Sequence, residues 1–97
     1  MITDKSGISS VGLGLLQVYR DVLTPPQKIE LKVRGKDQFL VVTGPKDTLV
    51  SNSFGWGRPD ERTNALFRAT VYLGLPLPLA MLQQIPPTQE RLIRSGK

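Results

Sequence analysis

The sequence predicts a small α+β domain, and three observations support this fold class. The chain has 97 residues, which is the length of one domain, so we expect a single domain over residues 1–97. Residues 28–54 alternate apolar and polar side chains around two short turns, as is typical of a three-stranded antiparallel meander. The segments on either side have apolar residues at helical spacing. Because helices flank consecutive strands, we expect the helices to pack on one face of a small sheet.

The segment before the meander predicts one helix. It begins at Ser9 or Ser10, which are suitable N-caps, and runs to about Leu23. One face of this helix carries apolar residues at helical intervals: Val11, Leu15, Val18 and Val22. The helix ends before residues 24–26 (Thr-Pro-Pro), because a residue that precedes proline is pushed out of the α region. Residues 1–8 are expected to form a flexible lead.

Two glycines interrupt this predicted helix. Gly12 and Gly14 would each cost about 1 kcal/mol relative to alanine in a helix interior. Two explanations are open: the helix begins later, near Leu13, or another part of the backbone packs closely against it at these positions.

The meander itself is predicted from three strands and two turns. Apolar and charged residues alternate in the first strand, Lys28–Arg34, so one of its faces should be buried. The second strand, residues 38–43, is rich in β-branched and aromatic side chains, and the third is expected over residues 48–54. Residues 35–37 form a turn with a glycine for positive φ, and residues 44–47 form a turn in which proline presets φ.

Two to three short helices are predicted after the meander. Asp60 is a suitable N-cap for a helix over residues 61–73, and a proline can begin a second helix over residues 78–84. Thr88 is expected to cap a last short helix over residues 89–94, whose arginines suit the negative end of the helix dipole.

The composition argues against catalysis and against metal binding. The sequence contains no cysteine and no histidine, so it lacks thiolates as well as the commonest general base and metal ligand. Most of the eight carboxylates fall at predicted turns, caps or solvent-facing positions, and helix capping explains the one adjacent pair, Asp60 and Glu61. We therefore predict that the protein is not an enzyme and expect neither a metal nor a cofactor.

The sequence also gives no sign of a membrane segment. Its first residues, MITDKSGISS, do not resemble a signal peptide, because charges stand where an apolar run would be needed. The longest apolar stretch, residues 71–85, contains Gly and Pro and is shorter than the roughly 20 residues that cross a bilayer. We expect a soluble protein that is intracellular or part of a larger particle.

The aromatic loop after the meander predicts a protein-interaction surface. Trp and Arg are enriched at interface hot spots, and here Phe54, Trp56 and Arg58 occur together on a glycine-rich loop. A second apolar patch is predicted at Leu75, Leu77 and Leu79. The sequence therefore predicts a non-catalytic interaction or assembly module, a small structural subunit of a homo-oligomer or of a larger complex. Alternatively, Trp56 covers the edge of the core and the leucines complete that core.

The basic charge leaves nucleic-acid binding as the alternative function. Thirteen Lys and Arg against eight Asp and Glu give a net charge of +5 and a pI near 10. The candidate contacts are Lys28, Lys32, Arg34, Lys36, Arg58 and Arg62. A single strand could lie on the sheet face that carries Lys32 and Arg34, with Phe39 or Trp56 stacking on a base. This hypothesis requires the cations to converge on one face; otherwise the charge only keeps a small domain soluble.

Overall fold

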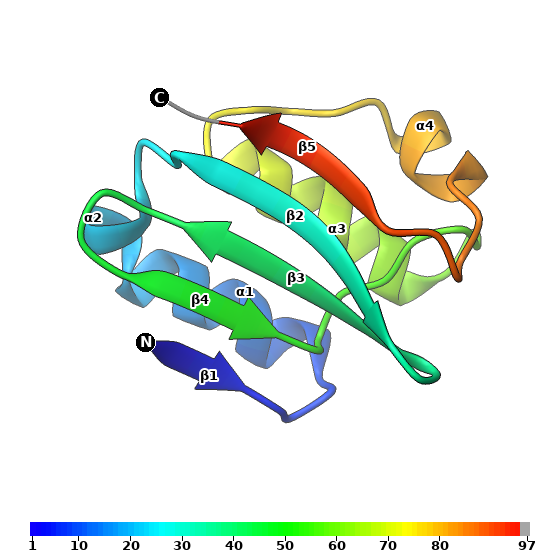
Figure 1. The fold of residues 1–97 in the computed structure, drawn as a ribbon, viewed down its shortest axis with the longest axis horizontal. Helices are drawn as coiled ribbons and strands as arrows, with labels where there is room; N and C mark the ends of the chain where they lie inside the picture. The colour runs from blue at the N-terminus through cyan, green and yellow to red at the C-terminus, as the bar shows by residue number, and fades with distance from the viewer. Residues whose placement is uncertain (96–97) are drawn as a thin grey trace.

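The computed structural model describes residues 1–95, which form a mixed β-sheet with helices on one side (Figure 1). The α+β prediction is confirmed at this level. The strands are β1 (Ile2–Asp4), β2 (Lys28–Arg34), β3 (Asp37–Thr43), β4 (Thr48–Ser51) and β5 (Arg91–Ser95). The helices are α1 (Ser9–Val18), α2 (Arg20–Leu23), α3 (Glu61–Tyr72) and α4 (Leu79–Gln84).

The sheet has the strand order β1-β4-β3-β2-β5. The predicted meander forms its centre, because β3 pairs antiparallel with β2 on one side and with β4 on the other. Strand β5 adds antiparallel to β2, and β1 adds parallel to β4. The prediction of a three-stranded antiparallel sheet was therefore wrong in extent: the described residues make a five-stranded mixed sheet.

Both edge strands come from segments that the sequence predicts differently. Residues 1–8 were expected to be flexible but contain β1, which has three residues and is too short to show a period. Residues 89–94 were expected to be helical but contribute to β5, whose conformation follows from pairing with the edge of β2. Just before β5 begins, Glu90 Oε2 accepts a hydrogen bond from the backbone N–H of Val33 at 2.9 Å. The Glu90 carboxylate therefore accepts a hydrogen bond from a backbone N–H of β2 that lies beyond the N-terminal end of β5.

Three of the four segments predicted to be helical form helices. Asp60 caps α3, and its carboxylate accepts a hydrogen bond from the backbone N–H of Thr63 at 3.0 Å. Pro78 occupies the N-cap position of α4.

The long N-terminal helix is split at Tyr19 into α1 and α2. Helix α1 does begin at Ser9, so the explanation that Gly12 and Gly14 delay its start is wrong. The details of α1 differ from the prediction, because Ile8 rather than Ser9 or Ser10 is its N-cap. Its buried face carries Leu13 and Leu16, whereas Val11 and Val18 of the predicted face are 41 % and 74 % exposed.

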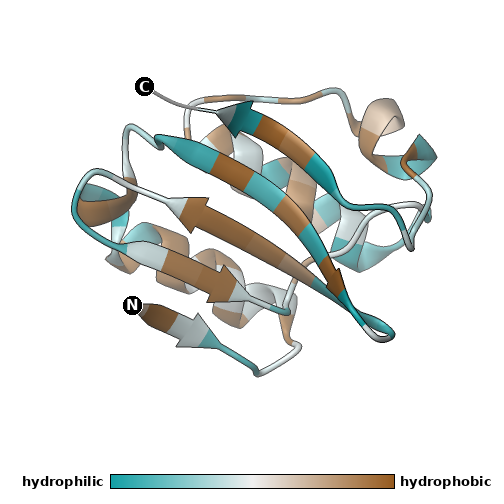
Figure 2. Cartoon of the chain, in the orientation of Figure 1, coloured by the Kyte–Doolittle hydropathy of each residue, from teal (hydrophilic) through white to brown (hydrophobic). Residues whose placement is uncertain are grey.

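The core lies between the sheet and the helices, and Figure 2 shows the apolar residues along β3 and β4. The inward side chains of the sheet include Leu31, Leu40, Val42 and Leu49, each at most 1 % exposed. The helices contribute Leu16, Leu23, Leu66, Ala69 and Leu82. Because only one face of the sheet is covered in this way, the position of the helices decides which sheet residues remain accessible.

Candidate functional site

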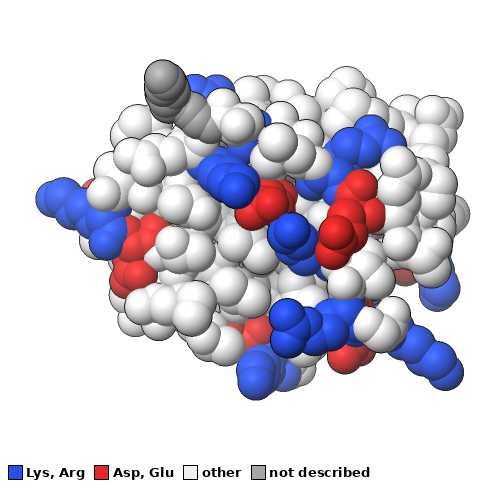
Figure 3. Space-filling view, viewed as in Figure 1, with Lys and Arg blue, Asp and Glu red and all other residues white. Residues whose placement is uncertain are grey.

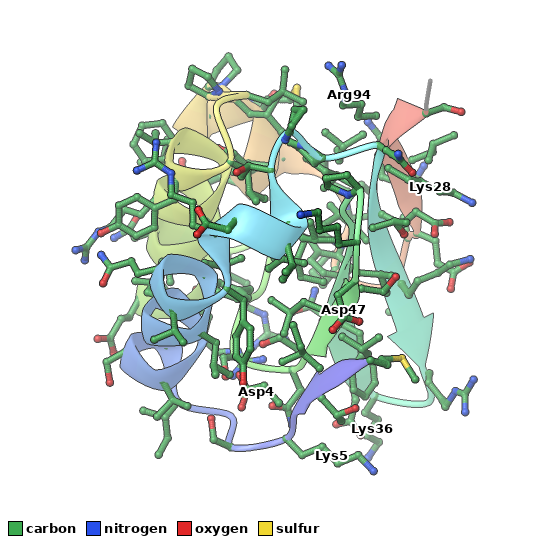
Figure 4. All side chains as sticks on the ribbon, turned by 90° about the vertical axis from the view of Figure 1, so that its left-hand side faces the viewer. Asp4, Lys5, Lys28, Lys36, Asp47 and Arg94 are labelled. Atoms are coloured by element: carbon green, nitrogen blue, oxygen red, sulfur yellow. The ribbon has the colours of Figure 1, made fainter. Side chains whose placement is uncertain are left out.

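The sheet face away from the helices is the first candidate site. Figures 1 and 4 show the helices on one side of the sheet only, and in Figure 4 Lys28 projects from the other side. In β2, Ile29 and Leu31 are buried under the helices, so pleating directs Lys28 and Lys32 outward. The same alternation directs the side chains between the buried positions of β3 and β4 outward. We define the open face as Lys28, Glu30, Lys32, Phe39, Val41, Thr43, Thr48, Val50 and Leu92.

The strand register brings the apolar residues of the open face together. Val41 of β3 stands opposite Val50 on one side and opposite Glu30 on the other. Glu30 in turn stands opposite Leu92 of β5, which is 52 % exposed. Phe39, Val41 and Val50 are half-buried although no helix covers them. The centre of the open face is therefore an apolar band on β3 and β4, and Glu30 of β2 separates this band from Leu92 of β5.

The charges of the open face gather on its β2 side. Glu30 carries two ion pairs, one to Lys28 Nζ at 3.6 Å and one to Lys32 Nζ at 3.4 Å. Figure 3 shows this face, with Lys and Arg spread over β2, β5 and the β2–β3 hairpin and with acidic groups between them. The area over β3 and β4 is largely uncharged. The face thus combines an apolar part with a mainly basic border.

A cleft beside the β2–β3 hairpin is the second candidate site. It has a volume of about 550 Å³ and is bounded by five segments that are distant in the sequence. Three basic side chains line it: Lys36 from the hairpin, and Arg58 and Arg62 from the start of the α3 region. We call this cavity the hairpin cleft. Asp37 and Asp60 also line it, so its charge is not purely basic.

Arg62 is held in place by backbone carbonyl groups. Its Nη2 donates to the carbonyl oxygens of Asn52 at 2.7 Å and Phe54 at 3.0 Å, and its Nη1 donates to that of Gly7 at 3.3 Å. These bonds tie the first loop of the chain to the segment after β4. They also fix a cation at the wall of the hairpin cleft.

The predicted partner-binding residues fall into different environments. Phe54 and Trp56 are 0 % and 1 % exposed, so neither side chain offers a partner a surface. Trp56 packs in the core, and its indole Nε1 donates to the carbonyl of Gln89 at 3.0 Å. Arg58 is exposed and lines the hairpin cleft. In the predicted leucine patch, Leu75 and Leu77 pack against the core and are only partly accessible to a partner. Leu79 is half-buried.

The predicted nucleic-acid contacts divide into two groups. Lys28 and Lys32 lie on the open face, where Glu30 partly neutralises them, and the alternation of β2 places Arg34 on the same side. Lys36, Arg58 and Arg62 line the hairpin cleft instead. Phe39 is on the open face opposite Lys32, whereas Trp56 is buried and cannot stack on a base. The six cations therefore do not converge on one surface.

Sequence reasoning missed the apolar residues that the open face exposes. Val41 and Val50 belong to strands whose apolar residues run without alternation, and such a run does not say which face a helix covers. Leu92 was assigned to a helix. The register with β2 is what places it beside Glu30.

Asp4 of β1 is a buried carboxylate. Asp4 is 4 % exposed and accepts hydrogen bonds from the hydroxyls of Ser51 and Ser53 and from the backbone N–H of Ser6. Burial raises the pKa of the Asp4 carboxyl, but the hydrogen bonds from Ser53, Ser6 and Ser51 outweigh burial and hold this pKa below its usual 3.8. A carboxylate so stabilised is a weak base. Its position indicates a structural contact between β1 and β4.

Within residues 1–95, no group of three or more Asp or Glu side chains is placed to hold a metal ion. None of the helices in the described part of the chain is long and apolar enough to cross a membrane.

Comparison with known proteins adds no assignment. No protein-family model, no curated protein and no solved structure matches the chain significantly. The function must therefore be inferred from the geometry of the chain's own residues.

Proposed function

We propose that the protein is a non-catalytic interaction module that binds a protein partner through the open face. The observation that carries this proposal is the half-buried apolar band of Phe39, Val41 and Val50 on the sheet face opposite the helices. Protein interfaces typically combine an apolar centre with a polar rim, and the open face has both. A partner would cover the band and leave the lysines of β2 at the border.

The charge of the open face indicates the chemistry of that partner. Lys28, Lys32 and Arg34 outnumber Glu30 along β2, and the whole chain has a net charge of +5. Two copies stacked through this face would bring like charges together, which opposes self-association. We therefore infer a partner with an apolar centre and an acidic rim, so that the chain is a subunit of a larger complex.

Replacing Val41 by lysine tests this proposal. A photoreactive residue in place of Thr48, which lies beside the apolar band, is used to crosslink the partner in the native host. The captured protein is then purified, and its affinity for the unmodified chain and for Val41→Lys is measured by calorimetry. We expect Val41→Lys to weaken binding about tenfold or more, because an amine would be buried in the apolar centre of the interface.

Val71→Lys is the matched control for this experiment. Val71 is 46 % exposed on α3, on the helical side of the molecule, so this change should leave the affinity for the partner unaltered. Equal losses in the two variants would refute the assignment of the open face. Analytical ultracentrifugation adds a second outcome: a concentration-dependent dimer that Val41→Lys abolishes would identify the occupant as a second copy and contradict the acidic partner.

The six predicted cations do not form one surface, so a nucleic-acid site that uses all of them is not supported. A single strand bound by Lys28, Lys32 and Arg34 alone is the second candidate occupant of the open face. It is favoured by Phe39, an aromatic ring directly opposite Lys32 in the β2–β3 register. It ranks second because Glu30 places a negative charge between Lys28 and Lys32. Fluorescence anisotropy of labelled oligonucleotides across a salt series separates the two candidates. Affinity that falls linearly with salt on logarithmic axes, and that Phe39→Leu reduces, would favour nucleic acid.

A further inference from the structure

We propose that the hairpin cleft binds the phosphate group of a small organic phosphate. The cleft is separate from the open face, so this inference does not rest on the proposed function. Its volume of about 550 Å³ lies within the range of small-molecule sites. Three cations, Lys36, Arg58 and Arg62, line it from two different segments.

The walls of the hairpin cleft are fixed by hydrogen bonds from side chains to the backbone. Arg62 joins the carbonyl groups of Gly7, Asn52 and Phe54, as described above. Gln38, which also lines the cleft, donates from Nε2 to the carbonyl of Trp56 at 3.0 Å and to that of Pro87 at 2.9 Å. Segments that are far apart in the sequence are thus held together before any ligand arrives. A site formed in advance loses little conformational freedom on binding.

The three cations and the two acids of the cleft differ in the contacts that they make within residues 1–95. Within the described residues, Lys36, Arg58 and Arg62 take part in no ion pair. The carboxylate of Asp60 caps α3 through the N–H of Thr63. Asp37 stands opposite Arg34 where the hairpin begins. A bound anion would supply the negative charge that these three side chains lack within residues 1–95.

The arrangement of the donors suits a phosphate. Arg62 uses three of the five N–H groups of its guanidinium on carbonyl oxygens, so two donors remain. The guanidinium of Arg58 is exposed at the cleft, and Lys36 approaches from the hairpin. Planar guanidinium groups bind phosphate oxygens in pairs, and an ammonium group adds a point charge. Because Asp60 already caps α3, the side chains rather than the helix N-terminus would bind the anion.

The phosphate could belong to a small molecule or to a nucleic-acid backbone. A cleft of about 550 Å³ with three cations has room for one phosphate ester rather than for a run of phosphates, so we assign the site to a small molecule. Titration calorimetry with inorganic phosphate, adenosine monophosphate and a single-stranded octanucleotide, at constant ionic strength, distinguishes these sources. Saturable binding of phosphate and of the mononucleotide is expected. Binding of the octanucleotide alone would overturn the assignment.

Two exposed cations provide the variants for this test. Lys36→Gln and Arg58→Gln should each weaken phosphate binding about tenfold, because each removes a charge-assisted contact. Arg62 is kept intact because it holds three carbonyl groups. Lys46→Gln is the charge-matched control: Lys46 is exposed in the β3–β4 turn and does not line the cleft. Thermal melts of all three variants establish that they remain folded.

Amide chemical shifts give a readout that does not depend on any variant. Phosphate added to the isotope-labelled protein should shift the amides of Gly35, Asn52 and Thr88, which line the hairpin cleft. Amides of the open face, such as that of Val50, should stay unchanged. Shifts spread evenly over all basic surfaces, or an equal loss of binding in Lys46→Gln, would show nonspecific screening and refute the site.

Discussion

Asp4 is the residue that fastens the first strand to the sheet. Its carboxylate accepts hydrogen bonds from Ser51, the last residue of β4, and from Ser53 just after it. Its own carbonyl accepts one from the N–H of Asn52 at 3.0 Å. Strand β1 has only three residues and forms an edge of the sheet. This side chain therefore adds to the pairing of β1 with β4, to the packing of Ile2 against the core and to the ion pair of the Met1 amino group with Asp47.

The lowered pKa of Asp4 predicts a loss of stability in acid. The folded pKa lies below the usual 3.8, so the contribution is complete above that pH and is lost as the pH falls through the folded value. Asp4→Asn should cost about 2 kcal/mol in unfolding free energy at pH 7, because hydrogen bonds to a charged acceptor are lost. Urea unfolding at pH 7 and at pH 2.5 measures both effects.

The difference between the unmodified chain and Asp4→Asn should shrink in acid. Asp21→Asn, a change at an exposed carboxyl group of α2, serves as the control and should cost little at either pH. A constant difference between the unmodified chain and Asp4→Asn at both pH values would contradict the assignment of the acid-sensitive term to Asp4.

Trp56 illustrates what sequence can and cannot say about one residue. Its glycine neighbours correctly predicted a loop, since the segment between β4 and α3 has no regular structure. The sequence left two positions for the indole, an exposed one and one at the core. The structure places it in the core, where its N–H reaches the carbonyl of Gln89, a contact between residues 33 positions apart. Local composition contains no signal for such a long-range partner.

At the scale of elements, α1 contains two glycines in contrasting surroundings. A Cβ at Gly12 would lie 2.8 Å from Ser53 Cβ and 2.9 Å from the ring of Phe54, so the helix approaches the segment after β4 closely there. A Cβ at Gly14 would meet nothing within 4 Å. The sequence-based suggestion that another segment packs closely is thus right for Gly12 and does not apply to Gly14. The atoms that approach Gly12 belong to side chains and not to the backbone.

This contrast predicts opposite effects of the same substitution. Gly14→Ala should stabilise the protein by about 0.5–1 kcal/mol, because alanine favours the helix and loses less conformational entropy on folding. Gly12→Ala should destabilise it by about 1–3 kcal/mol, because the methyl group overpacks the contact with Phe54. Thermal and urea unfolding of the two variants provide the comparison. If both changes move stability in the same direction, the packing described for α1 is incorrect.

The elements that sequence predicted well are those with a strong local signal. Helix α3 follows from its Asp60 cap and its helical spacing, and β2 follows from strict alternation. Strand β5 was mistaken for a helix because Thr88 resembles a cap and the arginines resemble a helix end. Its strand conformation depends on pairing with β2, about 60 residues earlier in the chain, which no local pattern records.

At the scale of the whole molecule, the two ends of the described chain complete opposite edges of the sheet. Strand β1 borders β4 and strand β5 borders β2, so neither outer strand of the central meander is an edge of the sheet (Figure 1). Sequence predicted the meander and the helical layer. It could not predict the face that the helices leave open, because that depends on how all the elements pack together.

Removing β5 should therefore affect the whole sheet. A chain that ends after Glu90 exposes the edge of β2 and loses the bond from Arg94 Nε to the carbonyl of Pro26. We expect a lower melting temperature and self-association, since an unpaired edge strand can pair with another molecule. Size-exclusion chromatography with light scattering and thermal melts measure both. A chain that ends after Ser95 keeps β5 and should behave like the full chain; equal behaviour of both truncations would contradict a structural role for β5.

Because Trp56 is buried, its fluorescence should show whether the segment that leads into β5 is docked. The chain contains a single tryptophan, Trp56. Its indole N–H donates a hydrogen bond to the carbonyl of Gln89, two residues before β5. Indole emission selected by excitation at long wavelength would come from this residue alone. Detachment of the segment that leads into β5 would let water reach the ring and move the emission to the red, even while the meander stays folded. Stopped-flow fluorescence would then time the docking of the last strand separately from the formation of the rest of the sheet.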